Sequence, residues 1–538
     1  MTRLRMLSLA LLLASPAAAA AGPATHHDIQ ARLDPGSGTI EVVDRVTLAR
    51  DLTPDEAGGY RFLLHAGMAP EVEGAGWSLE RVAEVVDAAF VGINATSETA
   101  GGEVPLEGWR LLAGDGAGQP VVLRYRGVIR HELSTSGEEY QRSFSETPGS
   151  IGPDGVFLAG TSYWLPAFGE QLVTFTLEVG GLTPPWDVVS QGRRTRHELA
   201  ADGTRTTAWR LEQPTEEVYL VAGPWHEYAE QAGDVEVLAF LRQDDPALAG
   251  RYLQATRRYL KLYESMLPPY PYRSFALVEN FWETGYGMPG FTLLGPRIIR
   301  FPWIITSSYP HELLHNWWGN SVFVDFDGGN WCEGLTAYLA DHLFAEQRGE
   351  AATYRRATLK KYSDFVSSGN DFPLVEFRSR RSAASEAVGY GKSLMVYHMV
   401  RRAIGDEAFL EAMSRFFEDH RFQRASFDEL AEAVETVTGG DWRPFFAAWT
   451  GRAGAPRLEI KDVGVVPSGS AELPWTVRLA LRQSQPEEPF TFTVPVAVTV
   501  EGRAEPLWVE AGSCHRDCLL EIPCPARPLR LAKPLGQS

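Results

Sequence analysis

Two histidines and two glutamates in the middle of the chain have the types and spacing needed for hydrolytic metal chemistry. His311 and His315 are four positions apart with Glu312 between them, and Glu333 follows eighteen positions after His315. On a helix, residues four apart share one face. Two neutral imidazoles and a carboxylate make a three-ligand zinc site that leaves one coordination position for water. Glu312 is then placed beside that water as its general base.

The tripeptide His-Glu-Leu occurs three times, which provides an internal test of this motif. The copies at 131–133 and 197–199 lack a second histidine at the next position of the helical face, whereas the copy at 311–313 has one. Structural alternatives exist for the same residues. The two histidines also suit a half-buried helix, and Glu333 also suits a capping box opened by Asn330. The complete set of four residues favours the metal site.

Two helices are needed to bring these side chains together. Serines and a proline at 306–310 are helix start signals, and Gly319 with Asn320 ends the first helix. A second helix is expected from about residue 331 to 345, and it would direct Glu333 back at the histidine pair. Asp341 on this second helix is either an outer partner of a metal ligand or a solvated acid.

The segments HELLHNWWGN and NWCEG resemble the gluzincin zinc aminopeptidase family, which includes membrane alanyl aminopeptidase, puromycin-sensitive aminopeptidase and leukotriene hydrolase. The resemblance covers about residues 250–456, including Tyr-Pro-Tyr at 270–272 and WTGRAGAP at 449–456. It implies a thermolysin-like, mostly helical catalytic domain that binds one Zn²⁺ through the two histidines and Glu333. Seventeen residues separate His315 from Glu333, where the family has eighteen, and we assign the missing residue to the loop at 322–329.

The resemblance also implies a role for Tyr390, which lies in a Tyr-Gly-Lys segment. The family has a tyrosine in a similar setting whose hydroxyl stabilises the oxyanion, and a phenol directed at developing negative charge suits that role. The alternative is a buried aromatic side chain on the helix that runs to Arg402.

One departure from the family concerns the substrate's amino group. The family carries Gly-Ala-Met-Glu-Asn on a strand along the cleft, and its glutamate holds the free amine, whereas this chain has Pro289 and Gly290 at those last two positions. Proline has no carboxylate and no N–H. The chain is therefore expected to be a divergent, bacterial-like member without strict N-terminal specificity. Glu279 and Glu283 are either substitutes for the missing acid or solvated strand-edge acids.

The same strand is expected to bind extended substrate through Gly287 and Met288. Many relatives in the family also carry a large helical C-terminal domain that closes over the active site. This chain instead returns to strands after about residue 455, so we expect a more open cleft.

The pattern along the chain predicts a multidomain α+β protein. Residues 23–245 form an N-terminal β-sheet domain, since 39–49, 121–128 and 172–179 alternate apolar and polar side chains. Residues 246–453 form the catalytic domain, with a strand patch at 275–295 and helical periodicity at 387–404, 407–418 and 427–437. Residues 454–538 form a small C-terminal β-sandwich.

Residues 1–21 have the basic start, short apolar centre and alanine-rich exit of a cleavable signal peptide. We therefore expect a periplasmic or secreted protein, and no later stretch has the roughly 18 apolar residues that a membrane anchor needs. The net charge of −19 argues against nucleic acid as a partner. An oxidising compartment favours a disulfide among Cys514, Cys518 and Cys524 with the pairing open, and a metal knuckle that uses His515 is the alternative.

These features together predict a zinc metallopeptidase that acts on peptide or protein substrates. Two alternatives remain open at this point. One is a catalytically silent periplasmic peptide-binding or scaffold protein on the same fold, and the other is a zinc hydrolase of a non-peptide substrate such as an epoxide. The sequence specifies neither the side-chain preference nor the oligomeric state.

Overall fold

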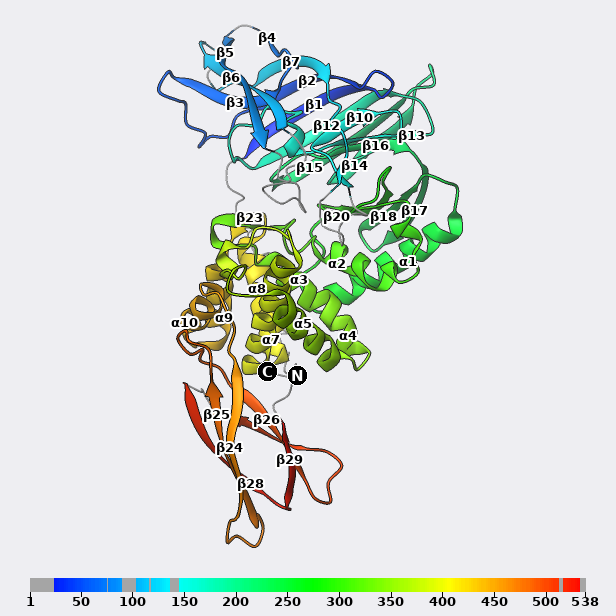
Figure 1. Ribbon diagram of the computed structural model, residues 1–538. Coiled ribbons are helices and arrows are strands. Elements are labelled where there is room, and N and C mark those ends of the chain that lie inside the picture. The colour runs from blue at the N-terminus through cyan, green and yellow to red at the C-terminus, as the bar shows by residue number, and fades with distance from the viewer. Residues whose placement is uncertain are drawn as a thin grey trace, which may run out of the picture.

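The computed structural model describes residues 24–532 apart from residues 75, 90–102, 116–117, 136–144 and 512–515. The chain forms three parts in a row, with β-sheets at the N-terminal end, a helical lobe in the middle and a narrow pair of sheets at the C-terminal end (Figure 1). This arrangement confirms the predicted multidomain α+β fold. The predicted signal peptide, residues 1–21, lies outside the described residues.

The N-terminal part is built mainly from a seven-stranded sheet, β14-β15-β12-β1-β2-β7-β4, and a four-stranded sheet, β10-β11-β16-β13. Alternate residues of β1 are buried, as a strand with one face on the core requires. The indole of Trp209 donates a hydrogen bond of 2.9 Å to the carbonyl of Val188, which ties the two sheets together. The strands of this part are β1 (Thr25–Asp34), β2 (Thr39–Thr47), β3 (Gly59–His65), β4 (Glu71–Glu73), β5 (Trp77–Ala89), β6 (Glu103–Ala113), β7 (Val121–Val128), β8 (Ser134–Thr135), β9 (Ser145–Glu146), β10 (Gly149–Gly152), β11 (Gly155–Leu158), β12 (Val173–Leu182), β13 (Trp186–Val189), β14 (Arg193–Leu199), β15 (Arg205–Thr215) and β16 (Leu220–Pro224).

A five-stranded sheet follows, and its strand β20 lines the cleft that contains His311 and His315. Its strands are β17 (His226–Ala232), β18 (Val235–Leu241), β19 (Ser274–Glu279), β20 (Gly285–Met288) and β21 (Phe291–Leu294), in the order β17-β18-β19-β21-β20. Helix α1 (Pro246–Glu264) connects the parallel strands β18 and β19. Strand β20 lies at the edge of the sheet and pairs with β21 alone.

This sheet corrects the predicted domain boundary between residues 245 and 246. Strands β17 and β18 lie before that boundary, yet β18 pairs with β19 of the catalytic part. The β17–β18 hairpin has the same period-two pattern as the strands before it. The sequence of this hairpin therefore predicts two strands, but it does not predict which sheet the strands join.

The helical lobe surrounds a set of fully buried tryptophans, which includes Trp317, Trp318 and Trp331. Two π-helical turns, η5 (Tyr338–His342) and η7 (Ala387–Lys392), interrupt long helices of this lobe. The described part of the chain holds no helix that is both long and apolar enough to cross a membrane. The helices are α2 (Ser308–Leu314), α3 (Cys332–Ala337), α4 (Leu343–Gln347), α5 (Ala351–Phe365), α6 (Ala383–Glu386), α7 (Ser393–Ile404), α8 (Asp406–His420), α9 (Phe427–Thr438) and α10 (Arg443–Thr450).

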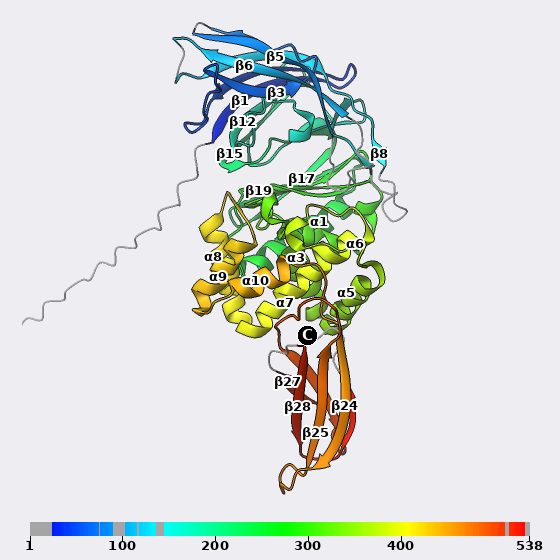
Figure 2. The same ribbon diagram turned by 60° about the vertical axis from the view of Figure 1, so that its left-hand side comes forward.

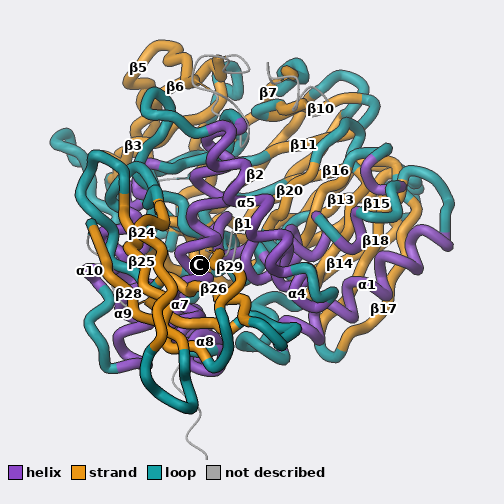
Figure 3. The backbone as a smooth tube through the Cα atoms, turned by 60° about the horizontal axis from the view of Figure 1, so that its bottom comes forward, coloured by secondary structure: helices purple, strands orange, loops and turns teal. Residues whose placement is uncertain are grey.

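The C-terminal part consists of two three-stranded sheets that extend away from the helical lobe (Figure 2). With this end turned forward, the C-terminal strands are drawn in front of the helical lobe (Figure 3). One sheet contains β24 (Leu458–Pro467), β25 (Trp475–Gln483) and β28 (Asp517–Cys524), and the other contains β26 (Val494–Val500), β27 (Leu507–Ala511) and β29 (Pro528–Ala532).

The C-terminal cysteines differ in their bonding. Cys518 is disulfide-bonded, whereas Cys524 is a free thiol buried in the core of this part. Cys514 lies outside the described residues. A disulfide is therefore present at this end of the chain, as an oxidising compartment favours, and Cys524 takes no part in it.

Candidate metal centre

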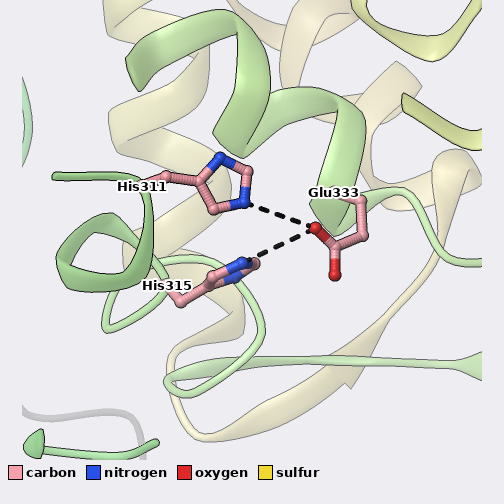
Figure 4. A group of neighbouring side chains, drawn as sticks. All are labelled: His311, His315 and Glu333. Carbon is pink, nitrogen blue, oxygen red and sulfur yellow. Dashed lines mark ion pairs between the residues drawn. The ribbon is translucent and has the colours of Figure 1, made fainter. Parts of the chain in front are cut away.

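His311 and His315 lie at the end of α2, with their side chains on the cleft side of the helix. The opposite face of the helix is apolar, and Tyr309, Leu313 and Leu314 are fully buried there. The Nε2 atoms of the two histidines lie 3.5 and 3.6 Å from the same atom, Oε2 of Glu333 (Figure 4). The chain between His315 and Glu333 thus folds back, so that the three side chains form one cluster.

The geometry of this cluster fits a zinc ion. Ligand atoms that are each about 2.0 Å from a tetrahedral ion lie roughly 3.3 Å from one another, close to the distances seen here. Oε2 of Glu333 is buried and has no hydrogen-bond partner among the described residues. A buried carboxylate oxygen without a partner is unfavourable unless a cation neutralises it. His311, His315 and Glu333 therefore have the donor set of a three-ligand zinc site.

Close backbone packing brings Glu333 to the histidines. Gly319 has a φ of 97°, and a Cβ at this position would lie 2.9 Å from Sγ of Cys332. Glycine thus allows the turn after α2 to touch the start of α3. The amide of Cys332 donates to Oδ1 of Asn330 at 3.1 Å, while Glu333 faces the histidines. The shorter spacing between the two segments does not withdraw Glu333 from the cluster, and the capping-box alternative is not observed.

Each histidine is oriented by a partner on its other ring nitrogen. Nδ1 of His311 lies 2.9 Å from Oδ2 of Asp341, and Nδ1 of His315 lies 3.1 Å from the carbonyl oxygen of Trp318. Such partners fix the ring and leave Nε2 available as a metal ligand. Asp341 lies in the π-helical turn η5, a kind of irregularity that is frequent at functional sites. The solvated-acid alternative for Asp341 is therefore wrong.

The carboxylates of the cluster favour positive charge at the histidines. Burial opposes protonation of His311, but the Asp341 carboxylate and then Glu333 raise the pKa of its imidazole to about 10. Burial also opposes ionisation of Glu333, but the imidazoles of His315 and His311 hold its pKa well below the usual range. Glu333 is thus a carboxylate, and the site attracts cations.

Glu312 lies against the strand expected to bind substrate. A Cβ on Gly287 would come within 2.8 Å of Oε2 of Glu312, so glycine is needed for this approach. Burial raises the pKa of Glu312 above its ordinary value. Tyr390 lies on the opposite side of the cluster, with its ring stacked on that of His311 at a centroid distance of 6.5 Å. Burial, and then the charge of Glu333, raise the pKa of Tyr390 well above its usual value.

A cleft of 1150 Å³ contains all of these groups. Gly287 and Met288, the predicted substrate residues, line it along the free edge of β20. Asn320 supports this strand by donating to the carbonyl oxygen of Gly287 at 3.2 Å. The structure thus brings the predicted ligands, Glu312, Tyr390 and the β20 strand to one place.

The two acids considered as substitutes for the missing family glutamate are already occupied. Glu279 is 2% exposed and forms an ion pair of 2.6 Å with Arg300, so it is not a solvated acid. Glu283 forms an ion pair of 3.0 Å with Arg297. Gly290 after β20 offers no replacement either, because it has no side-chain acceptor and its amide is a donor, which bonds to Oδ1 of Asn316 at 2.7 Å.

Sequence reasoning missed a further group of cleft residues, Arg378, Ser379, Arg380 and Arg381. The available signal was the run of three arginines in four positions. This signal is weak, because charged residues that follow one another in a loop usually lie on the solvated surface.

A second group of potential metal ligands lies where β13 and β14 of the N-terminal sheets meet β17. Asp187, His197 and Glu227 also offer one ligand atom each within 4.8 Å of the others. Arg205 donates to Asp187 at 2.9 Å, and Arg194 makes two hydrogen bonds to Glu227, of 2.9 and 2.6 Å. Because the guanidinium groups already neutralise both carboxylates, this group is an ion-pair network rather than a metal site.

Comparison with known proteins points to one family. Residues 305–449 match the Peptidase family M1 domain. Aminopeptidase N of Lactobacillus delbrueckii subsp. lactis is 26% identical over 231 residues, which is 38% of this chain and 27% of that protein. Aminopeptidase 2, mitochondrial, of Saccharomyces cerevisiae is 24% identical over 161 residues, or 29% of this chain and 17% of that protein. The chain therefore matches less than a third of the length of these relatives.

Solved structures extend the likeness to most of the fold. An M1 zinc metallopeptidase from Deinococcus radiodurans has a TM-score of 0.56 and 19% identity, and the match covers 81% of this chain and 96% of that one. An aminopeptidase A from Legionella pneumophila has a TM-score of 0.61 and 14% identity, with 94% of this chain and 57% of that chain covered. At these identities the likeness establishes a shared fold.

Proposed function

We propose that this chain is a zinc aminopeptidase that hydrolyses peptide bonds with one Zn²⁺ as cofactor, as the match of residues 305–449 to the Peptidase family M1 domain supports. The observation that carries the proposal is the buried, unpartnered Oε2 of Glu333 facing Nε2 of both His311 and His315. Glu312, the candidate base, lies beside this cluster in the same cleft.

When held by His311, His315 and Glu333, zinc supplies a Lewis acid that polarises the scissile carbonyl and makes water acidic near neutral pH. Glu312 takes a proton from the attacking water and passes it to the leaving amine. Its raised pKa suits a group that must hold that proton between the two steps. The Tyr390 hydroxyl stays protonated and donates a hydrogen bond to the oxygen on which negative charge develops.

The free edge of β20 is the proposed place for the peptide backbone, because an unpaired strand edge offers donors and acceptors to an extended chain. We propose no strict requirement for a free N-terminus. Pro289 removes the family's amine-binding acid, and the nearby acids Glu279 and Glu283 are already paired with arginines.

The test of the catalytic assignment compares two conservative variants with the parent protein. Glu312→Gln is expected to keep about one zinc per chain and to lower kcat by about 100- to 10,000-fold, because the proton acceptor is lost. Tyr390→Phe is expected to keep zinc and to lower kcat by about 100-fold or more. Zinc content and hydrolysis of a peptide library are measured together. Unchanged hydrolysis in Glu312→Gln would show that another group is the base.

The test of N-terminal specificity uses one peptide with a free and with an acetylated N-terminus. We expect both forms to be cleaved. Cleavage confined to the free form would mean that another residue replaces the missing glutamate. If zinc binds at about one per chain and no peptide is cleaved, the silent peptide-binding alternative replaces this proposal.

We also propose that the protein acts in the periplasm or outside the cell. This proposal rests on the signal-like residues 1–21 and on the cysteine chemistry of the C-terminal part. Peptides or proteins are the proposed partners, and nucleic acid is not.

A further inference from the structure

One wall of the cleft has an excess of positive charge, although the whole chain carries −19. Residues 378–381, here called the arginine loop, connect the 3₁₀ turn η6 (Leu374–Glu376) to α6, and all four residues line the cleft. Lys361 on α5 adds a further cation to this wall. Glu386 is paired with Lys361 at 3.1 Å and lies 3.8 Å from Arg380. Four cations thus face one acid.

The arginine loop is fixed next to the metal centre. The ring of Phe377 packs edge to face on that of Tyr390, with a centroid distance of 6.1 Å. Asn330 donates its backbone amide to the carbonyl oxygen of Phe377 at 2.8 Å and its side-chain amide to that of Arg378 at 3.0 Å. Asn330 is three residues before Glu333. The loop is therefore held between the ligand-bearing helix and the residue proposed to stabilise the oxyanion.

Two of the guanidinium groups in the loop have no acidic partner. In the part of the chain that the structure describes, neither Arg378 nor Arg381 forms an ion pair. Arg378 uses Nη1 to donate to the carbonyl oxygens of Val375 and Phe377, at 2.7 and 3.3 Å. Oγ of Ser379, between the arginines, is buried and has no hydrogen-bond partner among the described residues. The loop thus presents donors that still need acceptors.

The acids of the cleft show the opposite condition. Glu216 is paired with Arg424 at 3.1 Å, Glu283 with Arg297 at 3.0 Å, and Asp341 with His311 at 2.9 Å. Apart from Glu312 and Glu333, the carboxylates that line the cleft among the described residues are already in ion pairs. Away from the metal centre, a ligand entering this cleft therefore meets paired carboxylates and the guanidinium groups of Arg378 and Arg381.

We propose that the arginine loop is a specificity site that binds a carboxylate of the substrate. This inference rests on the proposed peptidase function and names the class of peptide. The carboxylate is either the C-terminus of a short peptide or the side chain of an aspartate or glutamate. The planar fork of an arginine matches a carboxylate with two parallel hydrogen bonds, and charged hydrogen bonds of this kind are the strong ones. Arg381 is the main contact, because its guanidinium makes no hydrogen bond or ion pair with the described residues that it would have to give up.

The experiment uses short peptides that differ in one carboxylate. Leu-Ala-Ala with a free C-terminus is compared with its amide, which tests the terminal carboxylate. Leu-Glu-Ala amide and Leu-Ala-Glu amide are each compared with their glutamine counterparts, which tests the side chain. We expect at least one acidic peptide to have a kcat/KM about 10-fold or more above its neutral partner, mainly through KM.

Arg381→Gln is expected to abolish this preference, because it lowers kcat/KM for the acidic peptides more than for their neutral partners. Arg381→Lys keeps the charge and is expected to retain part of the preference. Arg257→Gln, which removes one exposed arginine from α1 far from the cleft, is the matched control and should leave every ratio unchanged. Thermal unfolding of each variant shows whether the fold is intact.

Binding to full-length Glu312→Gln protein separates this inference from the proposed function. Peptide affinity is measured there by competition with a fluorescent acidic peptide, so no turnover is needed. A preference for the acidic member that disappears in Glu312→Gln/Arg381→Gln supports the inference even if no peptide is hydrolysed by the parent. Equal affinity for acidic and neutral members, or an equal loss for both in the Arg381→Gln background, overturns it even if hydrolysis is established.

Discussion

His197 and His311 each begin a His-Glu-Leu tripeptide, and each lies within ion-pair distance of two carboxylates, but their surroundings differ in charge. Asp187 and Glu227 beside His197 are bound by Arg205 and Arg194. Glu333 and Asp341 beside His311 have no arginine or lysine in an ion pair among the described residues. Arginines therefore neutralise the carboxylates of the first group, whereas the carboxylates of the second group face imidazoles, whose place as counter-charge a divalent cation can take.

This difference shows why residue types within reach of one another do not define a metal site. The donors must also lack competing partners. In the N-terminal group the carboxylate oxygens are acceptors of guanidinium hydrogen bonds, and Thr207 also donates to Asp187 at 3.0 Å. In the group around His311, Oε2 of Glu333 is buried, has no hydrogen-bond partner among the described residues and lies 3.5 and 3.6 Å from the two imidazoles. Variants made in both groups can therefore test whether the difference in arginine partners decides which group binds metal.

The largest expected effect comes from removing a carboxylate ligand. Glu333→Gln should lose most of its zinc and lower hydrolysis by at least about 1,000-fold, since the metal supplies several kcal/mol of transition-state stabilisation. Glu227→Gln makes the same chemical change in the other group and should keep one zinc per chain. Elemental analysis of dialysed protein and peptide hydrolysis are the measurements. Zinc loss in Glu227→Gln would show that the arginine-bound group also holds metal.

The next effect is on stability. Asp187→Asn should lower the free energy of unfolding of the N-terminal part by about 2–3 kcal/mol, because Arg205 and His197 lose a buried partner. Burial opposes ionisation of Asp187, but His197 and then Arg205 hold its pKa below the usual value. A depressed carboxyl pKa stabilises the fold above about pH 4 and ceases to do so as the pH falls further.

The stability difference between parent and Asp187→Asn should therefore be full near pH 7 and shrink below about pH 4. Urea unfolding at several pH values measures it, and zinc content is expected to stay at one per chain. A pH-independent difference would mean that packing, not the charge of Asp187, is responsible.

The smallest expected effect is on zinc affinity and comes from Asp341, the hydrogen-bond partner of the metal ligand His311. Asp341→Asn should weaken zinc affinity by about 10- to 100-fold, because His311 loses the acceptor that orients its ring. Hydrolysis should recover at raised zinc concentration. Glu198→Gln, in the tripeptide that begins with His197, removes an acid that is 65% exposed and serves as the control. Equal zinc affinity in parent and Asp341→Asn would remove Asp341 from the site.

Much of the catalytic centre was accessible from the sequence because its information is local. Four-residue spacing on a helix places His311 and His315 on one face in any fold that keeps the helix. The multidomain α+β class likewise follows from the period of apolar residues in each segment. The predicted strands at 39–49, 121–128 and 172–179 correspond to β2, β7 and β12.

Other features were decided by contacts between segments distant in the chain. The β17–β18 hairpin joins the catalytic sheet through pairing with β19, which its own pattern does not specify. The π-helical turns that carry Asp341 and Tyr390 have no signature in the periodicity of apolar residues. Which carboxylates bind arginines and which remain available for a cation depends on the packing of several elements. The sequence thus determined which residues carry the chemistry. The tertiary structure decided which carboxylates remain available for a metal ion, because the packing of distant segments determines which of them pair with arginines.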